Sequence, residues 1–301
     1  MLLGQVFNAS YQPFEFLQAR DRIAHQSASA LSDPRTAVLD ALHQVAFRHG
    51  LGNSLYAKDA DVHHLKRADL SEFAARNFAA DRMVIVGTGV AHEELEALVA
   101  SALKGVQVNA KGVKIPRSVY HGGETRLDRG AGSEAHYVIA YPSVSSSSPD
   151  YAASLVLKSL LDGNRRLKYG SLSGVSCLLG PASTGSTSVS ALGIHHSDAG
   201  LLGFYIQGED SEVASVASKS IAALKSIAGN GVEQDALARA RKAAIVELED
   251  SMTRDAKIEF VAQQVLNSGK IKSVREIAQS LETVTLNDVQ KVCRFFKMLT
   301  F

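Results

Sequence analysis

The chain contains ten histidines, and two of them one helical turn apart would be the starting point of a catalytic zinc site. Zinc peptidases combine such a pair with a third ligand and a glutamate that activates the bound water, in the order H-E-x-x-H or H-x-x-E-H. Neither order occurs in this sequence. The nearest approach is His121-Gly122-Gly123-Glu124-Thr125, where threonine takes the place of the second histidine and two glycines disfavour a helix. No metal site is predicted there.

The other closely spaced histidines also lack a chelating arrangement. His63-His64 and His195-His196 are adjacent pairs, and adjacent side chains diverge on a helix and point to opposite faces of a strand. His92 precedes Glu93 and Glu94 at the start of an expected helix, where acidic side chains favour the positive end of the helix dipole. We interpret these histidines as polar side chains of loops and surfaces.

Glycine and serine patterns predict neither a nucleotide site nor a nucleophile. Gly87-Thr88-Gly89 lies between an apolar run and an expected helix, but the third glycine of G-x-G-x-x-G would fall on His92. The serines at 145–148 lack the G-x-S-x-G context of a nucleophile elbow. The basic run at 164–168 is typical of a solvated surface. The sequence therefore predicts no catalytic residue, no metal ligand and no cofactor.

The composition excludes several classes of protein. With 301 residues, 46% hydrophobic and 21% charged, the chain has the content of a globular protein with room for two domains. Lys plus Arg number 32 against 31 Asp plus Glu, so no nucleic-acid or anionic-membrane footprint is visible. Cys177 and Cys293 are too few for a disulfide framework. No run approaches the roughly 20 apolar residues of a membrane span, and residues 1–16 do not resemble a secretory signal or a transit peptide.

Two stretches of the chain are repeated in the same order. Residues 35–45 align with residues 255–265 and share a Gln-Val pair, and residues 69–78 align with residues 288–296. Each stretch has the apolar spacing of an amphipathic helix, and a polar cap is expected before the second helix of each copy. Such helices can align by chance on their apolar stripes, but two pairs at nearly equal spacing favour two copies of one domain.

The elements around these helices differ between the two copies. The first copy continues into an apolar strand at 83–89 and a helix at 93–103, whereas the second stops at residue 301, where the matching strand would begin. The second half also shows three strands and three helices, with Asp150 as the cap of the first helix. The strands are expected at 135–141, 185–190 and 200–207, and the helices at 151–161, 212–227 and 233–249.

Strands and helices without strict alternation indicate an α+β fold. We predict two homologous domains: the C-terminal part of the first at 1–105, a linker at 106–124 and the second at 125–301. The first domain is expected to lack its N-terminal part, and the second its last strand. Sheet edges left open in this way favour aggregation, so we expect poor solubility of the isolated chain.

Five segments carry a family likeness. They are residues 42–56, 77–78, 82–90, 120–124 and 197–205, which read LHQVAFRHGLGNSLY, NF, RMVIVGTGV, YHGGE and SDAGLLGFY. Together they resemble the mitochondrial processing peptidase and core-protein family, a branch of the pitrilysin-type metallopeptidase superfamily. Each motif is short, but their order and spacing are specific, and the resemblance extends over residues 1–290.

The resemblance implies two duplicated α+β modules, in agreement with the repeat. It also implies a non-catalytic structural subunit of respiratory complex III, the ubiquinol–cytochrome c reductase. Such a subunit would lie on the matrix side of the mitochondrial inner membrane and have no transmembrane span. Its implied partners are the homologous core protein 1, cytochrome b, cytochrome c1 and the other subunits of a dimeric complex.

Active members of the superfamily hold zinc with H-x-x-E-H and a distal glutamate. The resemblance places the first motif before residue 1 and the glutamate in the helix around residues 22–31, which contain no carboxylate. Without three protein ligands the ion and its activated water are not held, so we expect no enzyme.

Two alternatives remain open. One is the non-catalytic α-subunit of the processing peptidase, which binds presequences through a glycine-rich loop. That loop would fall at 161–181, where the glycines are scattered rather than in a run. The other is a zinc metalloendopeptidase whose catalytic segment is missing here.

Overall fold

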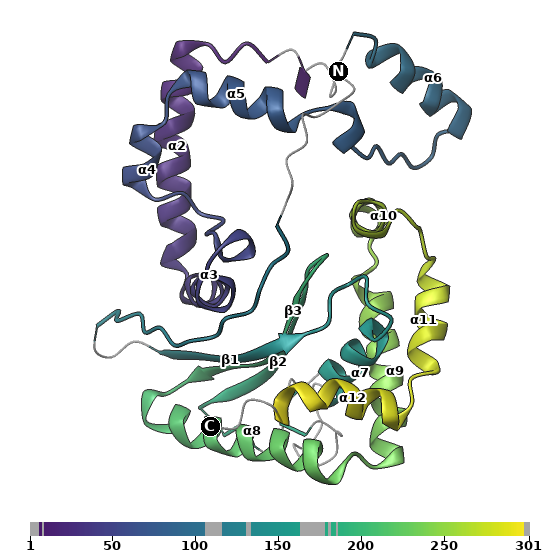
Figure 1. Ribbon diagram of the computed structural model, residues 1–301. Helices are drawn as coiled ribbons and strands as arrows, with labels where there is room; N and C mark the ends of the chain where they lie inside the picture. Colours follow the sequence, from purple (N-terminus) through teal and green to yellow (C-terminus); the bar gives the residue numbers. More distant parts are fainter. Residues whose placement is uncertain are drawn as a thin grey trace. The chain divides into compact units, whose positions relative to one another are not determined.

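The computed structural model describes residues 6–7, 9–105, 116–130, 134–162, 178–179, 182–184 and 186–297. These residues form a mixed helix and sheet fold, as expected (Figure 1). They divide into two compact units. Unit 1 comprises Met1–Ala37, Ser54–Arg117 and Arg254–Gly269, and unit 2 comprises Val38–Asn53, Ser118–Thr253 and Lys270–Phe301. Each unit is defined by its internal contacts and combines segments that are not consecutive in the chain. The domain boundaries 1–105, 106–124 and 125–301 therefore stay a prediction.

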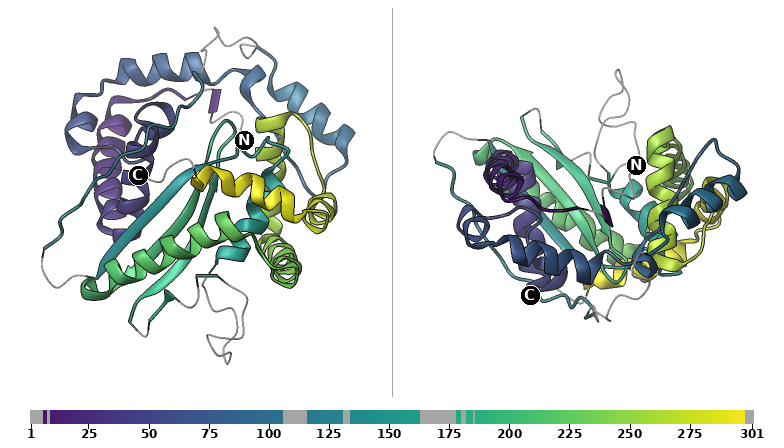
Figure 2. Two further views of the ribbon diagram at one scale, coloured as in Figure 1. Left: turned by 60° about the horizontal axis from the view of Figure 1, so that its bottom comes forward. Right: turned by 90° about the horizontal axis from the view of Figure 1, so that it is seen from above.

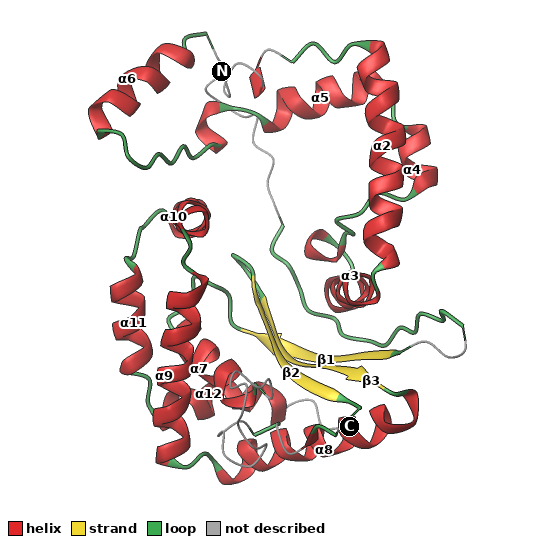
Figure 3. Ribbon diagram, turned by 180° about the vertical axis from the view of Figure 1, so that it is seen from behind, coloured by secondary structure: helices red, strands yellow, loops and turns green. Residues whose placement is uncertain are grey.

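Unit 2 contains a sheet of three antiparallel strands (Figure 3). The strands are β1 (Ala135–Ser143), β2 (Ser188–His195) and β3 (Gly200–Gly208), in the order β1-β3-β2. The central strand β3 has the sequence GLLGFYIQG and is buried along almost its whole length. A continuous apolar run of this kind is typical of a strand that is covered on both faces.

Gly203 allows β1 and β3 to approach closely. It is paired with Ala140 across the two strands. A Cβ atom at this position would collide with the carbonyl oxygen of Ile139 and would come within 2.8 Å of Ala140 Cα. Glycine is therefore required here by the neighbouring backbone, and not by a turn.

Helices cover one face of the sheet. The strands contact α7 (Tyr151–Leu161), α8 (Asp210–Asn230) and α12 (Leu286–Lys297), while α9 (Gln234–Ser251) and α11 (Val274–Glu282) pack against α7. Figure 2 shows α8 and α12 on the same side of the sheet. Val156, Leu157, Leu160 and Leu161 of α7 are fully buried, together with Phe204 of β3. The main core of unit 2 lies between α7, these helices and the sheet.

A second, smaller cluster lies on the other face of the sheet. Side chains alternate between the faces of a strand, so Leu202 belongs to the main core while Leu201 packs with Ala46 and Phe47 of α3 (Pro34–Phe47). The N–H of His121 donates to the carbonyl of Ala46 at 2.7 Å. Residues 38–53, which the sequence assigns to the first domain, thus form part of unit 2.

Unit 1 consists of helices, and no strand occurs among its described residues. They are α2 (Pro13–Ser32), α4 (Asp59–His64), α5 (Arg67–Asn77), α6 (His92–Ala102) and α10 (Arg254–Ser268). Among the buried apolar side chains of the described chain, only Ala37, Val62 and Ala79 belong to this unit. Large apolar side chains such as Phe14 and Phe73 are exposed instead. Unit 1 therefore has almost no core of its own within the described residues.

The predicted strand at 83–89 is wrong for the described structure. Residues 83–87 form neither a helix nor a strand and pair with no other strand. A strand needs a neighbour for its backbone hydrogen bonds, and the described part of unit 1 offers none. Two 3-10 helices, Gly50–Gly52 and Ala80–Arg82, complete the described elements.

Most other expected elements are present, with shifted ends. The strands expected at 135–141 and 200–207 are β1 and β3, and the helix expected at 151–161 has those bounds. The strand expected at 185–190 begins at Ser188 and continues to His195, because pairing with β3 carries it through Gly193. Asp150 lies at the N-cap of α7, but its side chain makes no cap bond and instead bonds Lys291 Nζ at 2.9 Å. The loop at 163–177 and the residues after Lys297 lie outside the described residues.

The repeated helices agree with the expected order. Residues 35–45 lie in α3, 255–265 in α10, and the second pair in α5 and α12. Asp69 and Asp288 lie inside the first turn rather than before it. Each accepts the backbone N–H three residues earlier, from Lys66 and Thr285, at 2.8 Å.

No helix among the described residues has the length and apolar content needed to cross a membrane.

Leu157→Ala should destabilise the protein by about 2–5 kcal/mol, because it removes fully buried methyl groups and leaves a cavity. The matched control is Leu127→Ala, at a side chain that is 50% exposed in the same unit. It should change the free energy of unfolding by no more than about 0.5 kcal/mol. Urea midpoints followed by circular dichroism measure both; equal losses in the two variants would contradict the position of the core.

Candidate functional site

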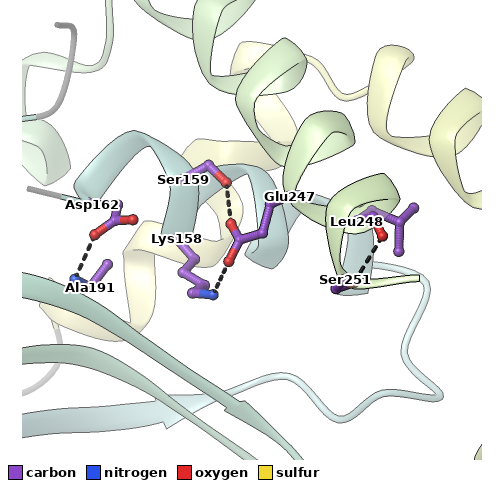
Figure 4. Close-up of polar contacts among 7 residues, drawn as sticks. All are labelled: Lys158, Ser159, Asp162, Ala191, Glu247, Leu248 and Ser251. Carbon is purple, nitrogen blue, oxygen red and sulfur yellow. Dashed lines mark hydrogen bonds and ion pairs between the residues drawn. The ribbon is translucent and has the colours of Figure 1, made fainter. Parts of the chain in front are cut away.

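An ion pair between Lys158 and Glu247 links α7 to α9 in unit 2. Lys158 Nζ lies 2.7 Å from Glu247 Oε1, and the hydroxyl of Ser159 donates to Glu247 Oε2 at 3.5 Å (Figure 4). The lysine and glutamate side chains are 24% and 32% exposed. The stem of Lys158 passes over Gly193 of β2, where a Cβ would lie 3.1 Å from Lys158 Cδ. These groups bond one another and hold two helices together.

The end of α7 is tied to the sheet. A carboxylate oxygen of Asp162 accepts the backbone N–H of Ala191 in β2 at 3.3 Å, and the hydroxyl of Ser251 donates to the carbonyl of Leu248 within α9 (Figure 4). The first contact satisfies a backbone N–H in the middle of β2, and the second satisfies a carbonyl in the last turn of α9. They serve the fold and leave no reactive group oriented toward a substrate.

His195 and His196 lie on opposite faces of the sheet, as the strand periodicity predicts, but they are half-buried rather than surface side chains. His195 Nδ1 lies 2.9 Å from the Val144 carbonyl, and its ring meets that of Tyr151 edge-on at 5.0 Å. Burial lowers the pKa of His195 more than the carbonyl of Val144 raises it. Its surroundings between β2 and α7 therefore favour the neutral form of the ring.

On the other face, His196 meets His43 of α3. Their Nε2 atoms lie 3.2 Å apart, and the ring of His196 also contacts Phe47 at 6.4 Å. Burial lowers the pKa of His196, and the neighbouring His43 lowers it further. Nearby, burial is the largest single influence on the pKa of Asp198 and raises it, but hydrogen bonds from Ser118, whose backbone N–H donates at 2.7 Å, together with the backbone of Asp198 and the nearby His196, lower this pKa overall.

A carboxylate with three hydroxyl donors joins α8 to the chain before β2. Glu212 Oε2 accepts the hydroxyl of Ser186 at 2.7 Å, that of Thr187 at 3.0 Å and that of Thr184. The hydroxyls of Ser186, Thr184 and Thr187 lower the pKa of Glu212. All three are consumed in holding one side chain, so none is available as a nucleophile.

A cavity of about 590 Å³ lies within unit 2 between α3, β1 and residues 120–127. Its wall includes Val38 and Val45 from α3 and the consecutive residues 135–140 of β1. His136 contributes a polar group, but its Nδ1 bonds the hydroxyl of Tyr205 at 2.5 Å. The cavity therefore has no convergent catalytic constellation.

The histidines and carboxylates that could bind a metal ion do not converge on one site within the described residues. Glu124 pairs with Arg126 at 2.8 Å on the surface, and His63 pairs with Asp59 on α4 at 3.3 Å. Residues 22–31 lie in α2 and carry no carboxylate. Among the described residues, no group of three or more His, Cys, Asp or Glu side chains could hold a metal ion. The His43–His196 and Lys158–Glu247 contacts were not foreseen, because they join residues 153 and 89 positions apart with no local pattern.

Comparison with known proteins identifies the family. A family model described as "Peptidase M16 inactive domain" matches residues 64–244, more than half of the chain. The chain therefore belongs to this family.

Individual relatives agree with this assignment. The chain is 31% identical over 258 residues to "Cytochrome b-c1 complex subunit 2, mitochondrial" of Yarrowia lipolytica, covering 85% of this chain and 59% of the relative. It is 31% identical over 300 residues to the Neurospora crassa protein of the same name, covering 97% of this chain and 64% of the relative. The chain thus spans somewhat less than two thirds of these relatives. The family resemblance expected from the sequence is confirmed.

A solved structure has the same fold. A chain of "Complex III2 from Candida albicans, Inz-5 bound" superposes with a TM-score of 0.79 at 21% identity, covering 92% of this chain and 67% of that chain. At this identity the likeness establishes the fold alone.

Lys158→Met should lower the free energy of unfolding by about 1–2 kcal/mol, because it removes the half-buried ion pair with Glu247 that joins α7 to α9. Adding Glu247→Leu should recover part of the loss, since the double variant replaces the half-buried carboxylate that had bonded Lys158 with an apolar side chain. A double-mutant cycle of urea midpoints measures the coupling. Arg126→Met is the control, because the Arg126–Glu124 side chains are 89% and 72% exposed and should contribute at most about 0.5 kcal/mol. Strict additivity at 158 and 247 would contradict the pair.

Proposed function

We propose that this chain is a non-catalytic structural core subunit of mitochondrial complex III that supports the assembly and stability of the electron-transfer complex. One observation carries the proposal: nearly the whole chain is similar to relatives named cytochrome b-c1 complex subunit 2. The fold likeness to a chain of a complex III structure supports it. No cofactor is required for this role.

The proposed absence of catalysis rests on chemistry. Active zinc peptidases need three protein ligands and an activated water. Residues 22–31, where the resemblance places the distal glutamate, have no carboxylate in this sequence. Restoring an H-x-x-E-H segment would therefore not complete the ligand set.

We further infer two homologous domains, the first lacking its N-terminal part and the second its last strand. The equivalent bonds of Asp69 and Asp288 at the starts of α5 and α12 support the duplication. The subunit would lie on the matrix side of the inner membrane. Its partners would be core protein 1, cytochrome b and cytochrome c1 in a dimeric complex.

A presequence-binding α-subunit of the processing peptidase is the second candidate. The chain is 27% identical over 299 residues to "Probable mitochondrial-processing peptidase subunit alpha-1, mitochondrial" of Arabidopsis thaliana. Residues 163–177, in the place of the presequence-binding loop, lie outside the described residues. The scattered glycines of that segment favour the structural subunit.

Affinity purification from mitochondria tests the proposal directly. The tagged full chain should co-purify with cytochrome b and cytochrome c1 and should migrate with complex III on native gels. Purified material should contain no stoichiometric zinc, and a metal chelator should leave it unchanged. The matched control is an identically tagged matrix protein of similar size, which should not carry the cytochromes.

Two results would overturn the proposal. Affinity for basic amphipathic presequence peptides without cytochromes b and c1 would favour the processing-peptidase subunit. One equivalent of zinc with chelator-sensitive cleavage would favour a metalloendopeptidase.

A further inference from the structure

The contact between His43 and His196 is the polar part of an attachment that holds residues 38–53 on the sheet of unit 2. Phe47 is 2% exposed and packs with Leu201, which is fully buried. The ring of Phe47 meets those of Tyr120 and His196 edge-on, with centroids 6.4 Å apart in each case. The two histidines come from different elements, α3 and the turn that follows β2, so their bond connects the helix to the sheet.

The hydrogen bonds of the pair define its protonation. His43 Nδ1 lies 2.8 Å from the carbonyl oxygen of Leu39, and a carbonyl can only accept, so this nitrogen carries a hydrogen. In the neutral ring Nε2 is then an acceptor, and His196 Nε2 donates to it across 3.2 Å. One added proton, on His196 Nδ1, leaves this N–H···N bond in place. A second added proton removes the acceptor and places two cations at contact distance.

We propose that the His43–His196 contact is a pH-sensitive latch that holds residues 38–53 on the sheet at neutral pH and releases them when both imidazoles are protonated. The proposal is independent of the complex III role. It assigns to the pair a conformational function that neither histidine has alone.

The other titratable groups around the pair do not replace it. Asp198, two residues after His196, raises the pKa of His196, whereas His195 lowers it. On α3, Asp40 accepts a hydrogen bond from Gln44 at 2.6 Å. From the segment 118–121, Tyr120 bonds the carbonyl of Ala140 at 3.4 Å, and its pKa is raised by burial. Of the groups that act on the pKa of His196, Asp198 raises it and so opposes release, and its carboxylate already accepts the Ser118 N–H.

The direction of the pH effect follows from the lowered pKa of His196, which burial and His43 produce. The released state binds protons more readily than the latched state, so acid favours release. The stabilising effect is complete above the ordinary histidine pKa of about 6.5 and is lost as the pH falls below it. One extra proton changes the equilibrium by about tenfold per pH unit at most.

Hydrogen exchange of the full chain, read by mass spectrometry and corrected for intrinsic rates, tests the latch. Between pH 7 and pH 5, exchange in residues 38–53 should rise about tenfold, while α7 and α8 stay protected. His43→Gln and His196→Gln should each reduce this rise to less than about twofold, because one titrating ring is gone. His63→Gln, at an exposed histidine of α4, is the matched control and should behave like the wild type.

Three outcomes would overturn the proposal: a flat wild-type profile, an unchanged rise in His43→Gln, or simultaneous opening of α7 and α8. If a variant fails to fold, nitrogen NMR of the wild-type imidazoles decides. Coupled titration of the two rings, with one step below the ordinary histidine pKa of about 6.5, would support the latch. Independent titration of both rings near pH 6.5 would exclude it.

Discussion

Unit 2 depends on the burial of one short helix. Leu157 and Leu160 of α7 have no exposed surface, and α7 contacts β2, β3, α9, α11 and α12. Fully burying a leucine contributes about 1.5–3 kcal/mol, which is a large fraction of the 5–15 kcal/mol by which a domain is usually stable. The polar bonds of Lys158 and Asp162 lie at the rim of this helix. These bonds fix the orientation of α7, and its buried apolar side chains provide the packing.

Unit 1 shows what the same kinds of helices do without a sheet. Short helices obtain most of their stability from packing of an amphipathic face, yet Phe14 and Leu17 on α2 are 62% and 49% exposed. Few buried apolar side chains hold the described residues of this unit together. Helices in this condition need further polypeptide surface for stability.

The sequence predicted helices and strands more accurately than it predicted contacts between residues that are distant in the chain. Periodicity predicted α7 and the central strand, because α7 is apolar on most sides and β3 is covered on both faces. The same reasoning failed at 83–89, since an apolar run becomes a strand only beside a partner, and partners are not encoded locally. It also placed His195 and His196 at the surface, although it foresaw that they face opposite ways. Their burial depends on which residues α3 and α7 bring across the sheet.

The polar groups of unit 2 explain why no catalytic constellation is seen among the described residues of this peptidase-type fold. Lys158 bonds Glu247, and Glu212 takes three hydroxyl groups. Each of these contacts joins two elements and uses the donors and acceptors that catalysis would need to keep free. Catalytic groups must instead converge on a space that a reacting atom can occupy. A chain whose half-buried polar side chains bond one another can keep the architecture of its family without a catalytic constellation among its described residues.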